Sequence, residues 1–340
     1  MAPRPLHVAV LGATGAAGRE LLRALEDLEL PVASMRLLGS GRSPAGAVEF
    51  KGEELRVETV KEGAFRGRDL VFFVASAEAS RAWGEKARGE GAIVIDASPA
   101  FRLDADVPLV VPEVNAAALA GFRARGIVAS PGATVTALSI ALRPLAAAAG
   151  LERVVVTALQ SVSGAGRGGV EQLEREASAL MNGRDPEVEG PIPHRIAFNV
   201  VPQVGDLVDG EAEEERAIVA ETRKVLGDAA LRISATAVRV PVFYGHALVV
   251  NVVTAGKLRA PDAREALRKA PGVKVLDDPG ERIYPMPMLA TNDDAVHVGR
   301  IREDRSHERG LDLFVAVDNM RKGVGGNLVQ IAEVLAAKHL

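Results

Sequence analysis

Residues 7–18 read His7-Val-Ala-Val-Leu-Gly12-Ala-Thr14-Gly15-Ala16-Ala-Gly18, and this stretch decides the fold of the first part of the chain. An apolar run is followed by three glycines at a GxxGxxG spacing, and a helical pattern begins where the glycines end. A strand that turns on glycines into a helix brings backbone N–H groups to the helix N-terminus, where a pyrophosphate binds. A structural turn would show the same glycines, but the position at the first strand–helix junction favours a nucleotide site. Its candidate residues are Gly12, Thr14, Gly15, Ala16 and Gly18.

Short apolar runs continue to alternate with helical patterns through residues 1–130, which is typical of a parallel α/β sheet. The runs are His7–Leu11, Arg36–Leu38, Asp69–Val74, Ile93–Asp96 and Ile127–Ala129. The glycine turn therefore belongs to a predicted Rossmann-like domain.

The end of the second predicted strand indicates which nucleotide this domain prefers. An NAD site usually has Asp or Glu at this point for the ribose 2′-hydroxyl. This chain has Ser40, Arg42 and Ser43 instead, which suit a 2′-phosphate, although Arg42 is also compatible with a solvated loop cation. We expect NADP as the cofactor rather than NAD.

Past residue 150 the pattern changes to longer β-rich runs, which predict an α+β domain. These runs are Arg153–Gln160, Ile233–Val242, Ala247–Thr254 and Leu313–Asp318. A polar insertion at Asn182–Arg195 predicts a surface loop. A final helix over Asn327–Leu340 has Leu328, Ile331 and Leu335 on one face.

Composition excludes several classes of protein. A formal charge of −4 without a basic block gives no basis for binding nucleic acid. The longest uncharged run, Gly126–Leu142, is interrupted by Pro131 and so does not predict a membrane helix. The chain has no cysteine and six scattered histidines, so we expect neither disulfides nor a metal site. The N-terminus enters a strand pattern by His7, which leaves no room for a signal peptide and favours a cytoplasmic location.

Five segments resemble, in order, the motifs of the aspartate-semialdehyde dehydrogenase family. They are Phe101–Asn115, Ser130–Leu145, Gln160–Gly166, Arg239–His246 and Asp318–Glu333. The resemblance covers nearly the whole chain. It implies an NADP-dependent oxidoreductase of amino-acid biosynthesis with a Rossmann-like domain and a catalytic and dimerisation domain, forming a homodimer. The expected boundaries are 1–130 with 320–340 for the nucleotide domain and 131–319 for the substrate domain.

The resemblance also assigns roles to individual residues. It places the acid/base at His246 and a glutamine beside the nucleophile at Gln160. It implies that Arg102, Arg239 and Glu214 bind an amino-acid-like substrate or anion, and that Asn327 contacts the nicotinamide nucleotide. Each of these residues also has a structural interpretation, such as a buried histidine, an ion pair or a polar cap.

The departures from the family pattern concern the chemistry itself. The family's nucleophilic cysteine falls on Ala133, or on Gly132 if the alignment slips by one position. The family's phosphate-binding lysine falls on Ala217, and Arg216 is about 100° away on a helix. After His246, Ala247 and Leu248 replace a hydroxyl residue and an acid, and Asp96-Ala97-Ser98 differs from the family's Asp-Asn-x-Ser.

These departures resemble those of Usg-type homologues, which vary at the catalytic loop. Three functions stay open: an active NADP-dependent semialdehyde dehydrogenase, a pseudoenzyme that binds NADP or an anion without turnover, and a non-catalytic subunit that pairs with an active paralogue. For the first, Thr134 or Ser130 would have to act as a substitute nucleophile. We expect Thr134 instead to cap or begin the following helix.

Overall fold

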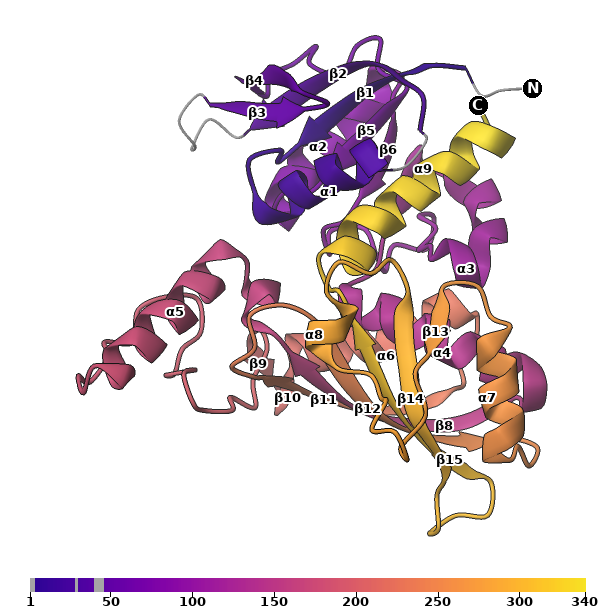
Figure 1. Cartoon of the computed structure of the whole chain (residues 1–340). Coiled ribbons are helices and arrows are strands. Elements are labelled where there is room, and N and C mark those ends of the chain that lie inside the picture. Colours follow the sequence, from indigo (N-terminus) through magenta and orange to yellow (C-terminus); the bar gives the residue numbers. More distant parts are fainter. Residues whose placement is uncertain (1–3, 28–29, 40–45) are drawn as a thin grey trace. The chain divides into compact units, whose positions relative to one another are not determined.

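The structure is a computed structural model that describes residues 4–27, 30–39 and 46–340. The chain divides into two compact units (Figure 1). The first unit contains the residues up to Gly132 together with Val324–Leu340, and the second is Ala133–Gly323. The chain therefore leaves the first unit once and returns to it at its end.

The first unit is built on a seven-stranded sheet with the order β3-β4-β2-β1-β5-β6-β7. All its neighbouring strands are parallel except β3 and β4, which form an antiparallel hairpin. Helices and a core on both sides of the central strands make this a Rossmann-like unit, as expected. The strands are β1 (Leu6–Leu11), β2 (Val32–Gly39), β3 (Ala47–Phe50), β4 (Glu53–Thr59), β5 (Leu70–Phe73), β6 (Ile93–Asp96) and β7 (Ile127–Ala129).

Helices from both ends of the chain cover this sheet. They are α1 (Ala16–Asp27), α2 (Ala77–Gly89), α3 (Pro112–Asn115), the 3₁₀ segment η1 (Ala116–Ala124) and α9 (Asn327–Lys338). Leu21 and Leu25 of α1 are fully buried in the same hydrophobic core as Leu328, Ile331 and Leu335 of α9. The predicted apolar face of the last helix therefore packs into the core of the first unit.

The sequence pattern missed the hairpin of β3 and β4 in the first unit, and β9, β10, β13 and β14 in the second. The two-residue loop of the β3–β4 hairpin, Lys51-Gly52, has positive φ at both positions (51° and 78°), as tight antiparallel hairpins require. The strand β2 is also longer than the predicted Arg36–Leu38, because its first half is only partly buried and lacks a continuous apolar run.

The second unit is built on a six-stranded sheet with the order β11-β8-β12-β15-β14-β13, so it mixes parallel and antiparallel pairs. Its strands are β8 (Leu151–Gln160), β11 (Arg232–Arg239), β12 (His246–Thr254), β13 (Val273–Val275), β14 (Val296–Glu303) and β15 (Gly310–Val317). A short hairpin of β9 (Leu207–Val208) and β10 (Glu211–Ala212) stands apart from this sheet.

One face of this sheet is covered by α4 (Ala133–Ala149), α6 (Glu213–Leu226) and α7 (Ala260–Arg268). On the opposite face the strand register aligns Thr157 of β8, Val249 of β12 and Phe314 of β15 in one row. Val249 is 45% exposed, and within the described residues no helix covers this row.

The remaining elements of the second unit lie outside the sheet. They include the short 3₁₀ segment η2 (Val162–Ala165), α5 (Arg167–Met181) and α8 (Pro287–Ala290). The predicted surface loop Asn182–Arg195 follows α5 and contains no helix or strand. The carboxylate of Glu176 in α5 is fully buried and accepts hydrogen bonds from the backbone N–H groups of Ile196 and Ala197 at 2.7 and 3.0 Å.

Candidate functional site

A groove of about 530 Å³ lies at the carboxyl ends of the parallel strands in the first unit. Gly12, Thr14 and Gly15 line it together with Ser76 and Trp83. This is the position at which open α/β sheets bind nucleotides. Gly39, the last residue of β2, also lines the groove. The candidates Ser40, Arg42 and Ser43 lie outside the described residues.

The glycines at this groove are required by close backbone contacts. Gly12 has φ of +96°, and a Cβ there would lie 2.5 Å from the carbonyl oxygen of Val74. A Cβ on Gly18, inside α1, would lie 2.3 Å from the carbonyl oxygen of Gly12. Gly18 and Ala16 therefore shape the turn from within the helix, whereas Gly12, Thr14 and Gly15 face the groove.

Asn327, the first residue of α9, is fully buried in the same unit. Its Nδ2 donates to the carbonyl oxygen of Val110 at 3.0 Å and to Ser130 Oγ at 2.8 Å. Its Oδ1 is buried and has no hydrogen-bond partner among the described residues. A buried acceptor without a donor is costly, so this oxygen is suited to accept a hydrogen bond from a ligand amide.

In the second unit, α4 begins at Ala133, the position assigned to the missing cysteine. A Cβ added to Gly323 would lie 2.4 Å from Ala133 Cβ, so the backbone of the C-terminal motif lies directly against this position. Thr134 is in the first turn of α4, as expected, and its Oγ1 accepts a hydrogen bond from Gln160 Nε2 at 2.8 Å.

Gln160 is the last residue of β8 and joins this helix start to α6. Its Nε2 also donates to Glu214 Oε1 at 2.6 Å. Gln160 is 4% exposed, so both bonds form in a largely dehydrated environment. The amide thus holds Thr134 and Glu214 on either side of the strand end.

His246 begins β12 and is 4% exposed. Its Nδ1 accepts a hydrogen bond from the backbone N–H of Ser161 at 3.2 Å and lies 3.0 Å from Ser161 Oγ. A backbone N–H can only donate, so Nδ1 carries no proton and the neutral ring carries its proton on Nε2. Burial, helped by the positive charge of Arg239, lowers the pKa of His246 to about 3. In this environment the ring is a neutral hydrogen-bond donor through Nε2.

Arg239 ends β11 and is 6% exposed. Its Nη1 donates to the carbonyl oxygen of Ser161 at 2.8 Å. Burial lowers the pKa of Arg239, and the negative charge of Glu214 opposes that shift. A Cβ on Gly164 would lie 2.7 Å from Arg239 Nη1 and 3.2 Å from His246 Nε2. The absence of a side chain at Gly164 therefore lets both groups approach the same point.

Sequence reasoning missed a polar network behind His246. Asn319 Oδ1 accepts from the backbone N–H of Gly245 at 2.9 Å, and Asn319 Nδ2 donates to Ser163 Oγ at 3.0 Å. Ser161 Oγ in turn lies 3.0 Å from Ser163 Oγ. These residues lie inside the quoted motifs, but only their contacts reveal that they position the histidine.

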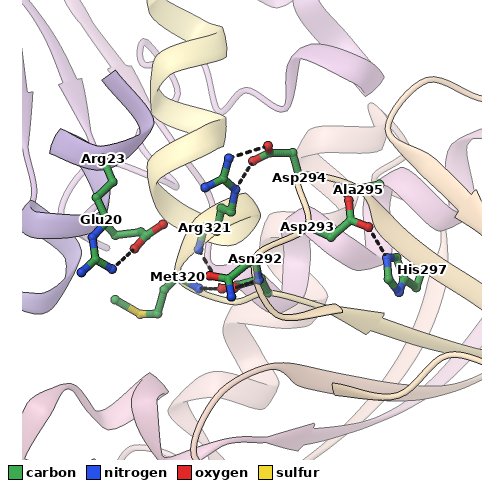
Figure 2. Close-up of polar contacts among 10 residues, drawn as sticks. Glu20, Arg23, Asn292, Asp293, Asp294, Ala295, His297, Met320 and Arg321 are labelled. Atoms are coloured by element: carbon green, nitrogen blue, oxygen red, sulfur yellow. Dashed lines mark hydrogen bonds and ion pairs between the residues drawn. The ribbon is translucent and has the colours of Figure 1, made fainter. Parts of the chain in front are cut away.

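The turn that carries Asn319 is fixed by the preceding aspartate. Asp318 Oδ1 accepts from the backbone N–H groups of Met320 and Arg321, and Oδ2 accepts from that of Asn292, at 2.8–2.9 Å. Figure 2 shows Asn292, Met320 and Arg321, with the Arg321 guanidinium paired to Asp294. The Asp318-Asn319 pair thus anchors the back of the site.

The structure therefore brings Gln160, Glu214, Arg239 and His246 together with the start of α4 in the second unit. Arg102 belongs to the first unit, where its Nη2 donates to the carbonyl oxygen of Ala97 at 2.6 Å. Asp96, fully buried nearby in sequence, accepts from the hydroxyls of Ser80 and Ser98 at 2.7 Å, and burial raises its pKa. Within the described residues no group of histidine and acidic side chains is arranged to hold a metal ion.

The structure also describes Ala217, the position at which the family has its phosphate-binding lysine. Ala217 and Glu214 are three residues apart on α6 and so share a face of that helix. Ala217 is half-buried, whereas Arg216 is exposed. Arg216 therefore does not take the place of a lysine at position 217.

Comparison with known proteins gives a family for this arrangement. A model described as the NAD binding domain of semialdehyde dehydrogenase matches residues 7–122, and one described as its dimerisation domain matches residues 142–322. The aspartate-semialdehyde dehydrogenase of Aquifex aeolicus is 43% identical over 336 residues, covering 98% of this chain and 99% of the relative. The protein of the same name from Synechocystis is 42% identical over 337 residues, covering 99% of both.

Solved structures agree with these relatives. The crystal structure of aspartate semialdehyde dehydrogenase II from Vibrio cholerae has a TM-score of 0.96 at 40% identity, covering 99% of this chain and 100% of that chain. The same protein has a structure complexed with ASA. These matches define a semialdehyde dehydrogenase scaffold of two domains and confirm the predicted fold class. The chain belongs to the aspartate-semialdehyde dehydrogenase family.

No helix in the described part of the chain is both long and apolar enough to cross a membrane.

Proposed function

We propose that this chain is a member of the family that keeps the nucleotide and substrate pockets but has lost thiol-dependent dehydrogenase turnover. The observation that carries the proposal is the start of α4, where Ala133 occupies the position of the family's nucleophile and contacts Gly323. A methyl group cannot attack an aldehyde, and the family's covalent chemistry depends on a thiolate.

The neighbouring hydroxyls do not offer a substitute nucleophile. Thr134 Oγ1 is bonded to Gln160, and Ser130 Oγ accepts from Asn327. His246 Nδ1 is already engaged by Ser161. Activation of a hydroxyl needs a base within hydrogen-bond reach that can accept its proton, and His246 presents Nε2–H instead. A role for His246 as a hydrogen-bond donor to a ligand oxygen therefore fits better than a role as general base.

Two features support binding of a nicotinamide dinucleotide. The glycine turn leaves backbone room for a pyrophosphate at the start of α1, and Asn327 Oδ1 is a buried acceptor to which no described residue donates. Such a cofactor supplies hydride exchange when bound. NADP is the preferred form because Ser40, Arg42 and Ser43 stand where an acid would bind a ribose hydroxyl. A related structure from Candida albicans, 25% identical with a TM-score of 0.76, is described as containing NADP.

For the substrate pocket we propose a small amino-acid-like anion. Arg239 supplies a buried positive charge and Glu214 a carboxylate for an ammonium group, while His246 Nε2–H is directed to the same region as Arg239. We further propose a homodimer formed through the uncovered sheet face, and amino-acid metabolism in the cytoplasm as the setting.

The test combines an activity assay with a binding measurement. Phosphate-dependent oxidation of aspartate semialdehyde with NADP should stay at background, whereas calorimetry should show saturable binding of NADPH that is tighter than binding of NADH. Arg42→Gln should reduce that preference by about 1–3 kcal/mol, the range of a charge-assisted hydrogen bond. Equal affinity for the two cofactors would remove the argument for NADP.

The second part of the test restores the cysteine and the lysine that the family uses and measures turnover. Ala133→Cys alone should give little turnover, because the phosphate lysine is still missing at Ala217. Ala133→Cys with Ala217→Lys should exceed the product of the single effects, since groups that act in one mechanism are not additive. Wild-type turnover that survives His246→Ala would contradict this account of the site, and turnover abolished by Thr134→Val would reinstate a hydroxyl nucleophile.

A second candidate is a non-catalytic subunit that pairs with an active paralogue. The uncovered face of the second sheet, with Val249 45% exposed, gives such a partner a surface. Co-expression with an active relative, followed by mass measurement of the assembled species, separates this case from a homodimer.

A further inference from the structure

The first unit contains a second hollow that has no part in the nucleotide groove. Its volume is about 350 Å³, and none of its lining residues lines the groove. It is formed by the middle of β2, by β4 from Leu55 to Glu58, and by Arg68 before β5. The polar side chains around it are Ser34, Arg36, Arg56, Glu58 and Arg68, and we call it the arginine hollow.

The strand register gathers positive charge on this face. Leu37 of β2 pairs in parallel with Val57 of β4. Continued back by one residue, that register sets Arg36 opposite Arg56 on the face opposite Leu37. Like charges directly opposite each other on neighbouring strands destabilise a sheet. The Arg36–Arg56 pair therefore lowers the stability of the sheet, and neither side chain belongs to the hydrophobic core.

Arg68 adds a third guanidinium to the same hollow. Its Nη1 donates to Ser34 Oγ at 2.8 Å, but its Nε is buried and has no partner among the described residues. Burial lowers the pKa of Arg68, and the positive charge of Arg36 lowers it further. A guanidinium with an unused donor beside a like charge is suited to an anion.

The carboxylates nearby do not balance these charges. Glu58 lies 3.5 Å from Arg36 Nε, and its side chain is 53% exposed, so the attraction is weak. Asp69 is already paired with Arg4 at 2.7 Å and accepts from the backbone N–H of His7. Arg56 makes no ion pair or hydrogen bond with any described residue. Of the charged groups that line the hollow, three are guanidinium groups and one is a carboxylate.

We propose that the arginine hollow binds a small, doubly charged oxyanion, either inorganic phosphate or the phosphate of a phosphomonoester, between Arg36, Arg56 and Arg68. Guanidinium groups match phosphate oxygens in pairs, and the Ser34 hydroxyl supplies a further polar contact. The anion separates the opposed guanidinium charges of Arg36 and Arg56. This site goes beyond the proposed function and does not depend on it, because it shares no residue with either pocket described above.

The experiment titrates inorganic phosphate and, separately, a phosphomonoester such as glycerol phosphate into the whole protein by calorimetry. Ionic strength is held constant with sodium chloride, since exposed charges are screened by salt. Wild type should bind at one saturable site, and Arg68→Gln and Arg36→Gln should each weaken binding at least tenfold. Tighter binding of the phosphomonoester identifies an organic ligand, and equal or weaker binding identifies free phosphate.

Two variants make the result decisive. Arg66→Gln removes the same charge two residues away, on an exposed side chain outside the hollow, and should leave the affinity unchanged. Arg56→Gln removes an exposed side chain that makes no hydrogen bond or ion pair with the described residues, so it tests the site even if Arg68→Gln fails to fold. Phosphate binding should also persist in saturating NADPH. Absence of saturable binding, equal loss in Arg66→Gln, or displacement of phosphate by NADPH would each overturn the proposal.

Discussion

The His246 ring is held by contacts that act on different atoms. Ser161 donates its backbone N–H to Nδ1, and the Nε2 side of the ring faces the space above Gly164. The Gly245 backbone next to the ring is bonded to Asn319. The orientation of the ring and its tautomer are thus both fixed before any ligand arrives, which is the condition for a preorganised hydrogen-bond donor.

The titration of His246 should be visible in the stability of the protein. The pKa of His246 is about 3 in the folded protein, compared with an ordinary value of 6.5. Between these two pH values the histidine is protonated in the unfolded chain and neutral in the folded protein. The stability contribution is complete above pH 6.5 and is lost as the pH falls toward 3. The slope from this residue is at most about 1.4 kcal/mol per pH unit.

His246→Gln should remove that slope. The measurement is the difference in unfolding free energy between wild type and variant at several pH values, from denaturant melts. Nitrogen-15 spectra of the histidine ring should show an unprotonated Nδ1 and a protonated Nε2 near neutral pH. The reverse assignment would rule out the donor role of this ring.

Gly164 should control ligand affinity more than stability. In Gly164→Ala the added methyl group crowds Arg239 Nη1 and His246 Nε2, so the two groups can no longer point to one place. We expect at least tenfold weaker calorimetric binding of aspartate semialdehyde, with a stability loss of about 1–3 kcal/mol from overpacking. Gly121→Ala, where a Cβ meets nothing within 4 Å, is the control and should bind as wild type does. Unchanged affinity in Gly164→Ala would show that Arg239 and His246 do not bind the ligand.

At the scale of elements, Glu176 is a buried polar link between α5 and the segment that follows it. Its carboxylate receives two backbone N–H groups and the Gln172 amide, at 2.7–3.0 Å, although the side chain is fully buried. Hydrogen bonds to a charged group are worth about 1.5–3 kcal/mol, and stranded buried donors add a penalty.

Glu176→Ala should therefore release the segment around Ile196 without unfolding either sheet. Hydrogen exchange should accelerate at Ile196 and Ala197 by at least tenfold and stay unchanged in β8 and β12. Glu174→Ala, on an exposed residue of the same helix, is the control. Equal acceleration across the whole second unit would show that α5 and the sheet unfold together instead.

The sequence predicted these elements unevenly for physical reasons. The central strands are buried on both faces and give continuous apolar runs, so β5 and β6 were predicted almost to their ends. The β3–β4 hairpin is largely exposed and carries Glu49, Glu53 and Glu54, so no apolar period marks it. Among site residues, the resemblance of the motifs to the family pattern indicated His246 and Arg239. The group that donates to His246 is the backbone N–H of Ser161. Because every residue except proline has such a group, the residue type cannot predict this contact.

At the scale of the whole molecule, the uncovered face of the second sheet should determine assembly. Thr157, Val249 and Phe314 form a row across β8, β12 and β15, in the part of the chain that matches a dimerisation domain. A β-branched and an aromatic side chain in the middle of an uncovered sheet favour burial against a partner.

Val249→Asp should convert the dimer to a monomer, because a buried charge without a partner costs several kcal/mol. Light scattering after size exclusion measures the mass, with Leu103→Asp as the control, since Leu103 is 59% exposed and lies in the other unit. A monomeric wild type would refute the proposed homodimer, and a dimeric Val249→Asp would place its interface elsewhere.

The return of α9 to the first unit has a consequence for synthesis on the ribosome. Leu328, Ile331 and Leu335 share one core with strands made some three hundred residues earlier, a span set by β1 at Leu6–Leu11. Contacts of such sequence separation form slowly and leave apolar surface open while they wait. The second unit is continuous from Ala133 to Gly323, so all of its residues are translated before α9. The unit whose strands are translated first is therefore the unit whose core is completed last, when α9 joins it.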